Sequence, residues 1–297
     1  MRALRWPVAA LQISAGAALA HQTGTPHDEP PGWTWDPWIT VPLLLAALLF
    51  WLGSRRLARR VERGADRLRR RAWLFAAGLL ILAAALVSPV HQAGERSFAA
   101  HMFEHELLML VGAPLLALAR PLATMLWAFP PAVRRSLGAL GAAGPIRSVW
   151  RLLTTPVTAT LFQAGALWLW HAPALFDRAL ASDAWHVAQH LSFIVTALLF
   201  WSAMLSPRTP RGVAALCLVV TSIVSGTLGA LMAFATSPWY AGYARLGMAP
   251  FGLSPAEDQQ LAGLLMWVPG GLVHAGAALL ILHRLLSDNG GEMGHAV

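Results

Sequence analysis

Two pairs of histidines in this sequence have the spacing of a metal site. His101 and His105 are four residues apart where one apolar run begins, and His186 and His190 are four apart where another begins. Residues i and i+4 lie on one face of an α-helix, about 6 Å apart along its axis. Two imidazoles from one helix can therefore bind a single ion. If the two helices are neighbours, we expect four imidazoles to converge.

Further donor atoms lie near these pairs. His171 ends another apolar run, and Met109 continues the face of His101 and His105 by one more turn. Met266, in the last apolar run, could supply a second thioether. Imidazole binds zinc, copper, iron and nickel, whereas thioether favours Cu(I). A set of histidines and methionines in a chain with a single cysteine therefore favours copper, in either oxidation state, with zinc and haem as the alternatives.

Three polar residues are candidates to orient these ligands. Glu104 lies between His101 and His105, and Asp258 and Gln259 open the last apolar run. A carboxylate or amide that hydrogen-bonds an imidazole fixes its tautomer and orientation. A structural role is the alternative for the later pair, because Ser254 and Glu257 have the spacing of a helix capping box. Asp258 would then lie in the first turn, where the helix dipole favours an anion.

The residues 101–105 also match the pattern H-x-x-E-H of inverted zinc peptidases. In that arrangement Glu104 would be the general base beside a metal-bound water. Such a site needs a further ligand, and a carboxylate such as Asp177 or Asp183 would have to supply it. A seven-helix zinc-dependent membrane hydrolase is therefore an alternative function.

Two other functions use the same residues. A haem-binding membrane electron carrier would use the histidine pairs as axial ligands from different helices. A copper importer would need polar groups that continue toward the cytoplasm, for which His274 alone is thin support. The three functions differ in what the purified protein should contain: zinc, haem or copper.

The composition indicates that these residues lie on membrane helices. The chain has 297 residues, of which 57% are hydrophobic and 12% charged, against about 25% charged in soluble domains. Apolar runs long enough to span a bilayer lie near residues 37–54, 72–89, 101–119, 154–171, 184–204, 213–235 and 259–283. We therefore predict an all-α polytopic membrane protein with a seven-helix transmembrane bundle. Pro114 and Pro269 fall within spans, where proline frees backbone groups that need other partners, so kinks are expected there.

The arginines predict the orientation of the bundle. The chain has no lysine, and its net charge of +8 comes from arginines in short loops, as the positive-inside rule requires. This pattern favours contact with membrane lipid over binding to nucleic acid. Seventeen arginines fall in loops on one side of the predicted spans and three on the other. The N-terminus should be periplasmic and the C-terminus cytoplasmic, with the histidine pairs at the periplasmic side.

The domain organisation follows from the same pattern. Arg2 and Arg5, a short apolar stretch and Ala18-Leu19-Ala20 predict a signal peptide over residues 1–20, or an extra N-terminal span. Residues 21–35 form a periplasmic tail rich in proline and tryptophan. The seven-helix transmembrane domain covers residues 36–286, and a cytoplasmic tail covers residues 287–297.

Several longer motifs occur along residues 70–285. They are Ser88-Pro89, His101-Met-x-x-His105, Ala113-Pro114-Leu115-Leu116, Trp168-x-Trp170-His171-x-Pro173, His186-x-x-x-His190 with Phe193, and Asp258-Gln259-Gln260-x-x-Gly263-x-x-Met266-Trp267-x-Pro269-Gly270. With these motifs the chain resembles the polytopic CtaG-type assembly factors of caa(3)-type cytochrome c oxidases. A single-span copper chaperone shares the CtaG name, but its paired cysteines are missing here.

The resemblance implies a protein of the bacterial inner membrane that helps to mature the oxidase, by delivering copper to one or more oxidase subunits. His101, His105, His186 and His190 match motif positions, and their metal role is our inference from their chemistry. We therefore expect a metallochaperone or assembly factor rather than an enzyme, and from thioether chemistry we expect Met109 or Met266 to favour the cuprous state.

Overall fold

The fold is helical throughout the part of the chain that is described. A computed structural model describes residues 30–60 and 64–293. The chain divides into two units, residues 1–30 and 31–297, and the fold below is that of the second. The described residues contain helices and no strand, apart from one isolated bridge between Ala249 and Leu253. The predicted all-α class is confirmed, whereas the predicted signal peptide lies outside the described residues.

Each predicted apolar run coincides with a long helix or a set of consecutive helices. These are α1 (Pro37–Ala58), α2 (Ala65–Leu86), α4 (Phe98–Glu106) with the π-helix η1 (Leu107–Gly112) and α5 (Ala113–Ala119), α9 (Pro156–Trp170), α11 (Asp183–Met204), α12 (Arg211–Ala233) and α14 (Pro255–Met293). We call the continuous segment Phe98–Ala119 the central helix. Helix α14 runs through residues 287–293, where the sequence predicted a tail.

The chain is a multi-pass membrane protein. Among the described residues, five helices are long and apolar enough to cross a membrane: α1, the central helix, α11, α12 and α14. A sixth span results if α8 (Gly144–Leu153) and α9, which meet at a bend of 66°, are counted together. The start of α2 carries Asp66 and four arginines, so its apolar part is only residues 72–86. The count of seven spans and the orientation of the termini stay predictions.

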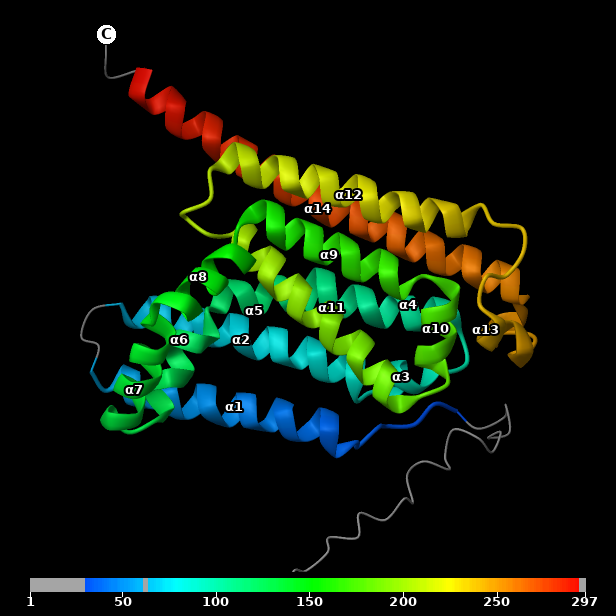
Figure 1. The fold of residues 1–297 in the computed structure, drawn as a ribbon, viewed down its shortest axis with the longest axis horizontal. Coiled ribbons are helices and arrows are strands. Elements are labelled where there is room, and N and C mark those ends of the chain that lie inside the picture. Colours follow the sequence, from blue (N-terminus) through cyan, green and yellow to red (C-terminus); the bar gives the residue numbers. More distant parts are fainter. Residues whose placement is uncertain (1–29, 61–63, 294–297) are drawn as a thin grey trace, which may run out of the picture. The chain divides into compact units, whose positions relative to one another are not determined.

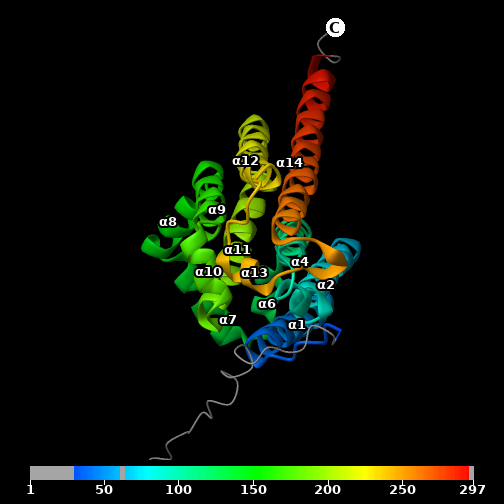
Figure 2. The ribbon, with the colours of Figure 1, turned by 90° about the vertical axis from the view of Figure 1, so that its right-hand side faces the viewer.

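The central helix contacts α2, α11 and α14 and is the most deeply buried of the candidate spans. The short helices α3 (Pro89–Gly94), α10 (Pro173–Leu180) and α13 (Ala241–Leu246) lie at the end of the bundle where α4 and α11 begin (Figure 1). Figure 2 views that end, which we call the site end. The remaining helices are α6 (Pro121–Met125), α7 (Pro131–Ala142) and α8. Two short 3-10 helices also occur: η2 (Leu126–Ala128) between α6 and α7, and η3 (Pro250–Gly252) before α14.

Glycines let α12 and α14 pack backbone to backbone. A Cβ atom at Gly263 would lie 2.5 Å from the carbonyl oxygen of Gly229 and 2.5 Å from the amide nitrogen of Ala233. Small residues at such positions allow membrane helices to approach closely, where van der Waals contact replaces the hydrophobic drive that lipid does not supply. The two helices run side by side along most of α12 (Figure 1).

Pro114 changes the hydrogen bonding of the central helix. The amide of Ala113 donates to Leu108, five residues back, so the chain forms a π-helix there. The next hydrogen bond of this pattern would run from the amide of residue 114 to the carbonyl of Met109. Residue 114 is a proline and has no N–H to donate. The indole Nε1 of Trp201 on α11 donates to that carbonyl instead, at 2.9 Å. The disturbance expected at Pro114 is therefore a π-helix stabilised from the neighbouring helix.

Candidate metal centre

The two histidine pairs face each other at the site end. The ring centroids of His101 and His105 are 4.4 Å apart, and those of His186 and His190 are also 4.4 Å apart. Between the helices, the centroids of His101 and His186 are 5.5 Å apart, and those of His105 and His190 are 4.9 Å apart. The structure thus brings all four imidazoles into contact, as expected of neighbouring helices.

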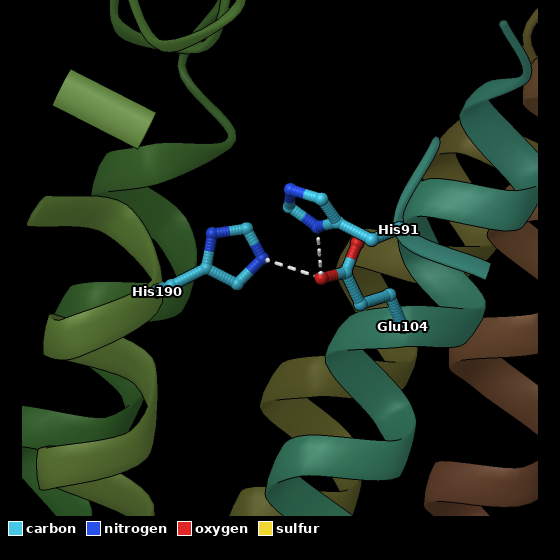
Figure 3. Close-up of side chains that lie close together, drawn as sticks. All are labelled: His91, Glu104 and His190. Atoms are coloured by element: carbon cyan, nitrogen blue, oxygen red, sulfur yellow. Dashed lines mark hydrogen bonds and ion pairs between the residues drawn. The ribbon is translucent and has the colours of Figure 1, made fainter. Parts of the chain in front are cut away.

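A fifth histidine and a carboxylate complete the group. Nδ1 of His91, on α3, lies 2.8 Å from Oε1 of Glu104, and Nε2 of His190 lies 3.2 Å from the same oxygen (Figure 3). One donor atom from each of these three residues lies within 4.8 Å of the others, close enough to hold one metal ion. The ring of His91 also stacks on that of His186, with centroids 5.5 Å apart. We call His91, His101, Glu104, His105, His186 and His190 the histidine cluster.

Several donor atoms of the cluster are buried without a hydrogen-bond partner. They are Nε2 of His101, Nε2 and Nδ1 of His105, Nε2 of His186 and Oε2 of Glu104. His101, Glu104 and His105 are at most 2% exposed. An unsatisfied buried polar group costs about 1–3 kcal/mol, and bound metal would satisfy several at once. Nitrogen and carboxylate donors suit zinc, copper, iron or nickel, so these residues fit a metal ion.

Three contacts position His91. Ser88 caps α3 by accepting a hydrogen bond from the amide of Val90 at 3.2 Å. Gly94 lets α3 approach α4, because a Cβ there would lie 3.2 Å from Cα of His101 and 3.4 Å from Oε2 of Glu104. The hydroxyl of Tyr243 on α13 donates to the carbonyl of Gly94 at 2.6 Å. The helix that carries His91 is therefore fixed from both sides.

Glu104 sets the charge of His91. Burial by itself lowers the pKa of the His91 imidazole, but the hydrogen bond and the negative charge of Glu104 outweigh burial. The pKa of His91 therefore lies above its usual 6.5. In the metal-free protein, His91 keeps its proton to a higher pH than an exposed histidine would, and a metal ion that binds His91 must displace that proton.

Comparison with known proteins identifies the family. The model of the cytochrome c oxidase caa3 assembly factor family, Caa3_CtaG, matches residues 48–288. The chain belongs to this family. The match contains the whole histidine cluster and the helices that position it. No significant match is found among curated proteins or solved structures.

In this caa3 assembly factor, Asp258 contacts the helix that carries the ligands rather than an imidazole. Its carboxylate accepts hydrogen bonds from the hydroxyl of Ser97 at 2.8 Å and from the amides of Phe98 at 2.6 Å and Ala99 at 3.3 Å. Asp258, in the first turn of α14, therefore caps the first turn of α4. The expected contact of Asp258 with an imidazole is not seen, and its effect on the site passes through α4.

Gln259 is also placed away from the imidazoles. Its side-chain oxygen accepts from the amide of Trp239 at 2.7 Å, and its side-chain nitrogen donates to the carbonyl of Ser237 at 3.3 Å. Gln259 thus fastens the segment before α13 to α14. The capping box at the start of α14 is present, since Oε2 of Glu257 receives the amide of Ser254 at 2.8 Å and the amide of Glu257 donates to the Ser254 hydroxyl at 3.3 Å.

His171 lies outside the cluster. Its Nδ1 is 2.7 Å from the carbonyl of Leu167, and its Nε2 is 3.3 Å from the sulfur of Met102. The rings of Phe176 and Phe193 contact both His171 and the α4 histidines, so they lie between them. The structure does not bring His171 among the ligands proposed from the sequence.

The two methionines are separated from the histidines as well. Met109 and Met266 line a cavity of about 20 Å³ deeper in the bundle, together with His274. The mixed histidine and methionine site expected from the sequence is thus divided into two places. Asp177 is also elsewhere, because its carboxylate accepts from the amides of Ala241 at 3.2 Å and Gly242 at 2.9 Å.

Proposed function

We propose that this assembly factor binds copper in the histidine cluster and passes it to a cytochrome c oxidase subunit. The family supplies the role in oxidase assembly. The metal role rests on one observation: six metal-binding side chains from three helices meet, half of them buried and half of them partly buried, and several of their donor atoms have no partner. Copper is favoured over the other metals that bind imidazole because cytochrome c oxidases contain copper centres.

The number of donors suits transfer. Five imidazoles and one carboxylate exceed the roughly four ligands that hold a copper or zinc ion. An ion bound by His91, Glu104 and His190 has further imidazoles of His101, His105 and His186 within ring contact. It can exchange one ligand for another without losing all of them, and a ligand from the recipient subunit can enter in the same way.

We also propose that the cluster faces the periplasm of the bacterial inner membrane. The arginine-rich segments lie at the ends of the spans opposite to the cluster, which is the arrangement that the positive-inside rule predicts. Copper would then enter from the periplasmic side, and an oxidase subunit would receive it at the same surface.

The experiment compares cluster variants with a matched histidine variant. We expect the purified protein to bind Cu(II) in air, and His101→Ala with His186→Ala to lose that Cu(II) and to lower the copper content and activity of the oxidase in membranes. His283→Ala, on the exposed far part of α14, should behave like the unchanged protein. Absence of copper binding in the unchanged protein, or normal oxidase maturation with the double variant, would refute the proposal.

A zinc hydrolase is the second candidate, because the H-x-x-E-H residues lie within the cluster. In the structure Oε1 of Glu104 already lies at 2.8 Å and 3.2 Å from two imidazole nitrogens, which suits a ligand better than a general base. Elemental analysis distinguishes the two, since the hydrolase should retain zinc. A haem carrier is disfavoured by ring centroids 4.4–6.0 Å apart, which leave no room for a porphyrin, and it would show a Soret band.

A further inference from the structure

A small cavity lies inside the bundle, below the histidine cluster. It has a volume of about 20 Å³ and is enclosed by the central helix, α9, α12 and α14. Its polar lining includes Glu106, Met109, Gln163, Met266 and His274. Met109 follows His105 by four residues, so the cavity lies about 6 Å further along the central helix than the cluster. A space of this size holds one water-sized particle.

The donor atoms around the cavity are only partly satisfied by the protein. The side-chain nitrogen of Gln163 donates to the sulfur of Met109 at 3.5 Å, and the Gln163 oxygen is buried without a partner. Gln163 itself is 8% exposed. Oε2 of Glu106 is likewise buried and unpartnered. Such atoms in a low-dielectric interior are costly unless bound water or an ion satisfies them.

His274 is held as a neutral ligand. Its Nδ1 lies 2.7 Å from the carbonyl of Gly270, which can only accept, so Nδ1 carries the proton and Nε2 keeps its lone pair. The ring of Trp201 stacks on His274 at 5.6 Å with an angle of 7° between the planes. The imidazole is therefore fixed in both orientation and tautomer, as metal-binding histidines commonly are.

We propose that this cavity is a second copper site, specific for the monovalent cuprous ion. Two thioethers and a neutral imidazole are ligands that select Cu(I). Glu106 is the carboxyl group among the lining residues, and the loss of its proton balances the entry of one positive charge, whereas a divalent ion would leave an unpaired charge in the membrane interior, which is costly. The inference rests on the proposed function only in that copper must first be delivered to this protein.

The two sites differ in their preferred oxidation state. The histidine cluster offers nitrogen and oxygen donors, and the inner cavity offers sulfur and nitrogen, so the inner cavity is the softer site. Ag(I), a soft monovalent ion, should enter the same cavity, whereas Zn²⁺ should be restricted to the cluster.

The test uses the full chain with its methionines replaced by selenomethionine and with His101→Ala and His186→Ala to disable the cluster. Loaded with Cu(I) under ascorbate, this protein should bind about one Cu(I), and X-ray absorption at the copper edge should show selenium in the first shell. Met109→Leu with Met266→Leu should remove both the selenium signal and the ion. Met204→Leu, which replaces another buried methionine, should change neither.

Two results would overturn the proposal: no selenium neighbour of copper in the labelled protein, or loss of the selenium signal on Met102→Leu, since Met102 lies beside His171 instead. The labelled protein with its cluster intact gives the same readout, so the test does not depend on any variant folding. Oxidase maturation in the cluster variants is measured in a separate experiment. A failure of the proposed function of the histidine cluster can therefore be distinguished from a failure of the proposed Cu(I) site in the cavity.

Discussion

Glu104 is the only acid within the histidine cluster, and it touches two imidazoles through one oxygen. We predict that Glu104→Gln lowers copper affinity by about 10–100-fold, because it keeps the size of the side chain but removes the charge that orients and balances the ligands. A competition titration with a copper chelator measures the change. Glu257→Gln, in the exposed capping box, should leave affinity unchanged, and equal affinities for the two variants would contradict a role for Glu104 at the metal.

We predict that His91 makes copper binding by the histidine cluster depend on pH. Its raised pKa means that the metal-free protein gains stability from the protonated imidazole below pH 6.5 and loses that contribution as pH rises through the raised value. Copper requires the neutral ring, so its affinity should rise with pH over the same window and then level off. Titrations at several pH values measure this rise. With His91→Asn the rise should be shallower, and an identical pH profile would count against His91 as a ligand.

The arrangement of the candidate site could be predicted only where the signal lies in nearby residues of the sequence. The four histidines at spacing i, i+4 were found because helical periodicity places such pairs on one face regardless of the rest of the fold. His91 is a single histidine in a short helix, and only the packing of α3 on α4 through Gly94 brings it to the others. Asp258 and the methionines were placed correctly on their helices, but their partners are set by helix packing, which the sequence does not display.

At the scale of helices, the hydrogen bond from Trp201 to the π-helix should make a measurable contribution to the free energy of unfolding. Trp201→Phe keeps an aromatic ring but leaves the carbonyl of Met109 without its donor. We expect a loss of about 1–3 kcal/mol of stability, measured as a lower midpoint of denaturation in detergent. Trp73→Phe, on a residue that is 70% exposed, is the control, and equal midpoints would show that the carbonyl finds another donor.

The cap that α14 places on α4 should matter for both stability and metal binding. Asp258→Ala removes the acceptor for three donors at the start of α4 and should cost about 0.5–2 kcal/mol. Because His101 follows in the next turn, copper affinity should fall too, with partial recovery in Asp258→Asn. Thermal unfolding and copper titration measure the two effects. Asp288→Ala, in an exposed ion pair on α14, should alter neither, and unchanged affinity in Asp258→Ala would mean that the cap does not act on the site.

The helices themselves were predictable because apolar runs and their flanking charges are features of the sequence. Every predicted run became helical, while the ends moved by a few residues, as at α2, which begins among its arginines. The bend between α8 and α9 and the π-helix were not foreseen in form. The π-helix depends on a partner far along the chain, since Trp201 donates to the carbonyl of Met109.

At the scale of the whole bundle, most arginines and the metal-binding histidines lie at opposite ends of the helices. Away from the site end, Arg56 donates to the carbonyl of Ala128 at 2.6 Å and Arg134 lies 3.9 Å above the ring of Trp127. Such contacts hold arginines beside the membrane surface, where anionic lipids attract them. The bundle is thus polarised along its helix axes.

This polarity predicts which residues are accessible from each side of the membrane. In a Cys217→Ala background, Arg208→Cys should react with a membrane-impermeant maleimide only after the cells are opened, because it lies in a predicted cytoplasmic loop. Met248→Cys, at an exposed position of the site end, should react in intact cells once the outer membrane is permeable to the reagent. The reverse pattern would invert the topology and place the histidine cluster in the cytoplasm.

The glycine contact between α12 and α14 limits how the bundle can open. Where Gly229 and Gly263 meet, main-chain atoms touch, and no side chain there can rotate to make room. Any opening of the bundle must therefore occur between other helices, and at the site end α4 and α11 meet through imidazole rings. In the proposed function, a motion that separated α4 from α11 would also separate the imidazoles that hold the metal, so opening and release would coincide.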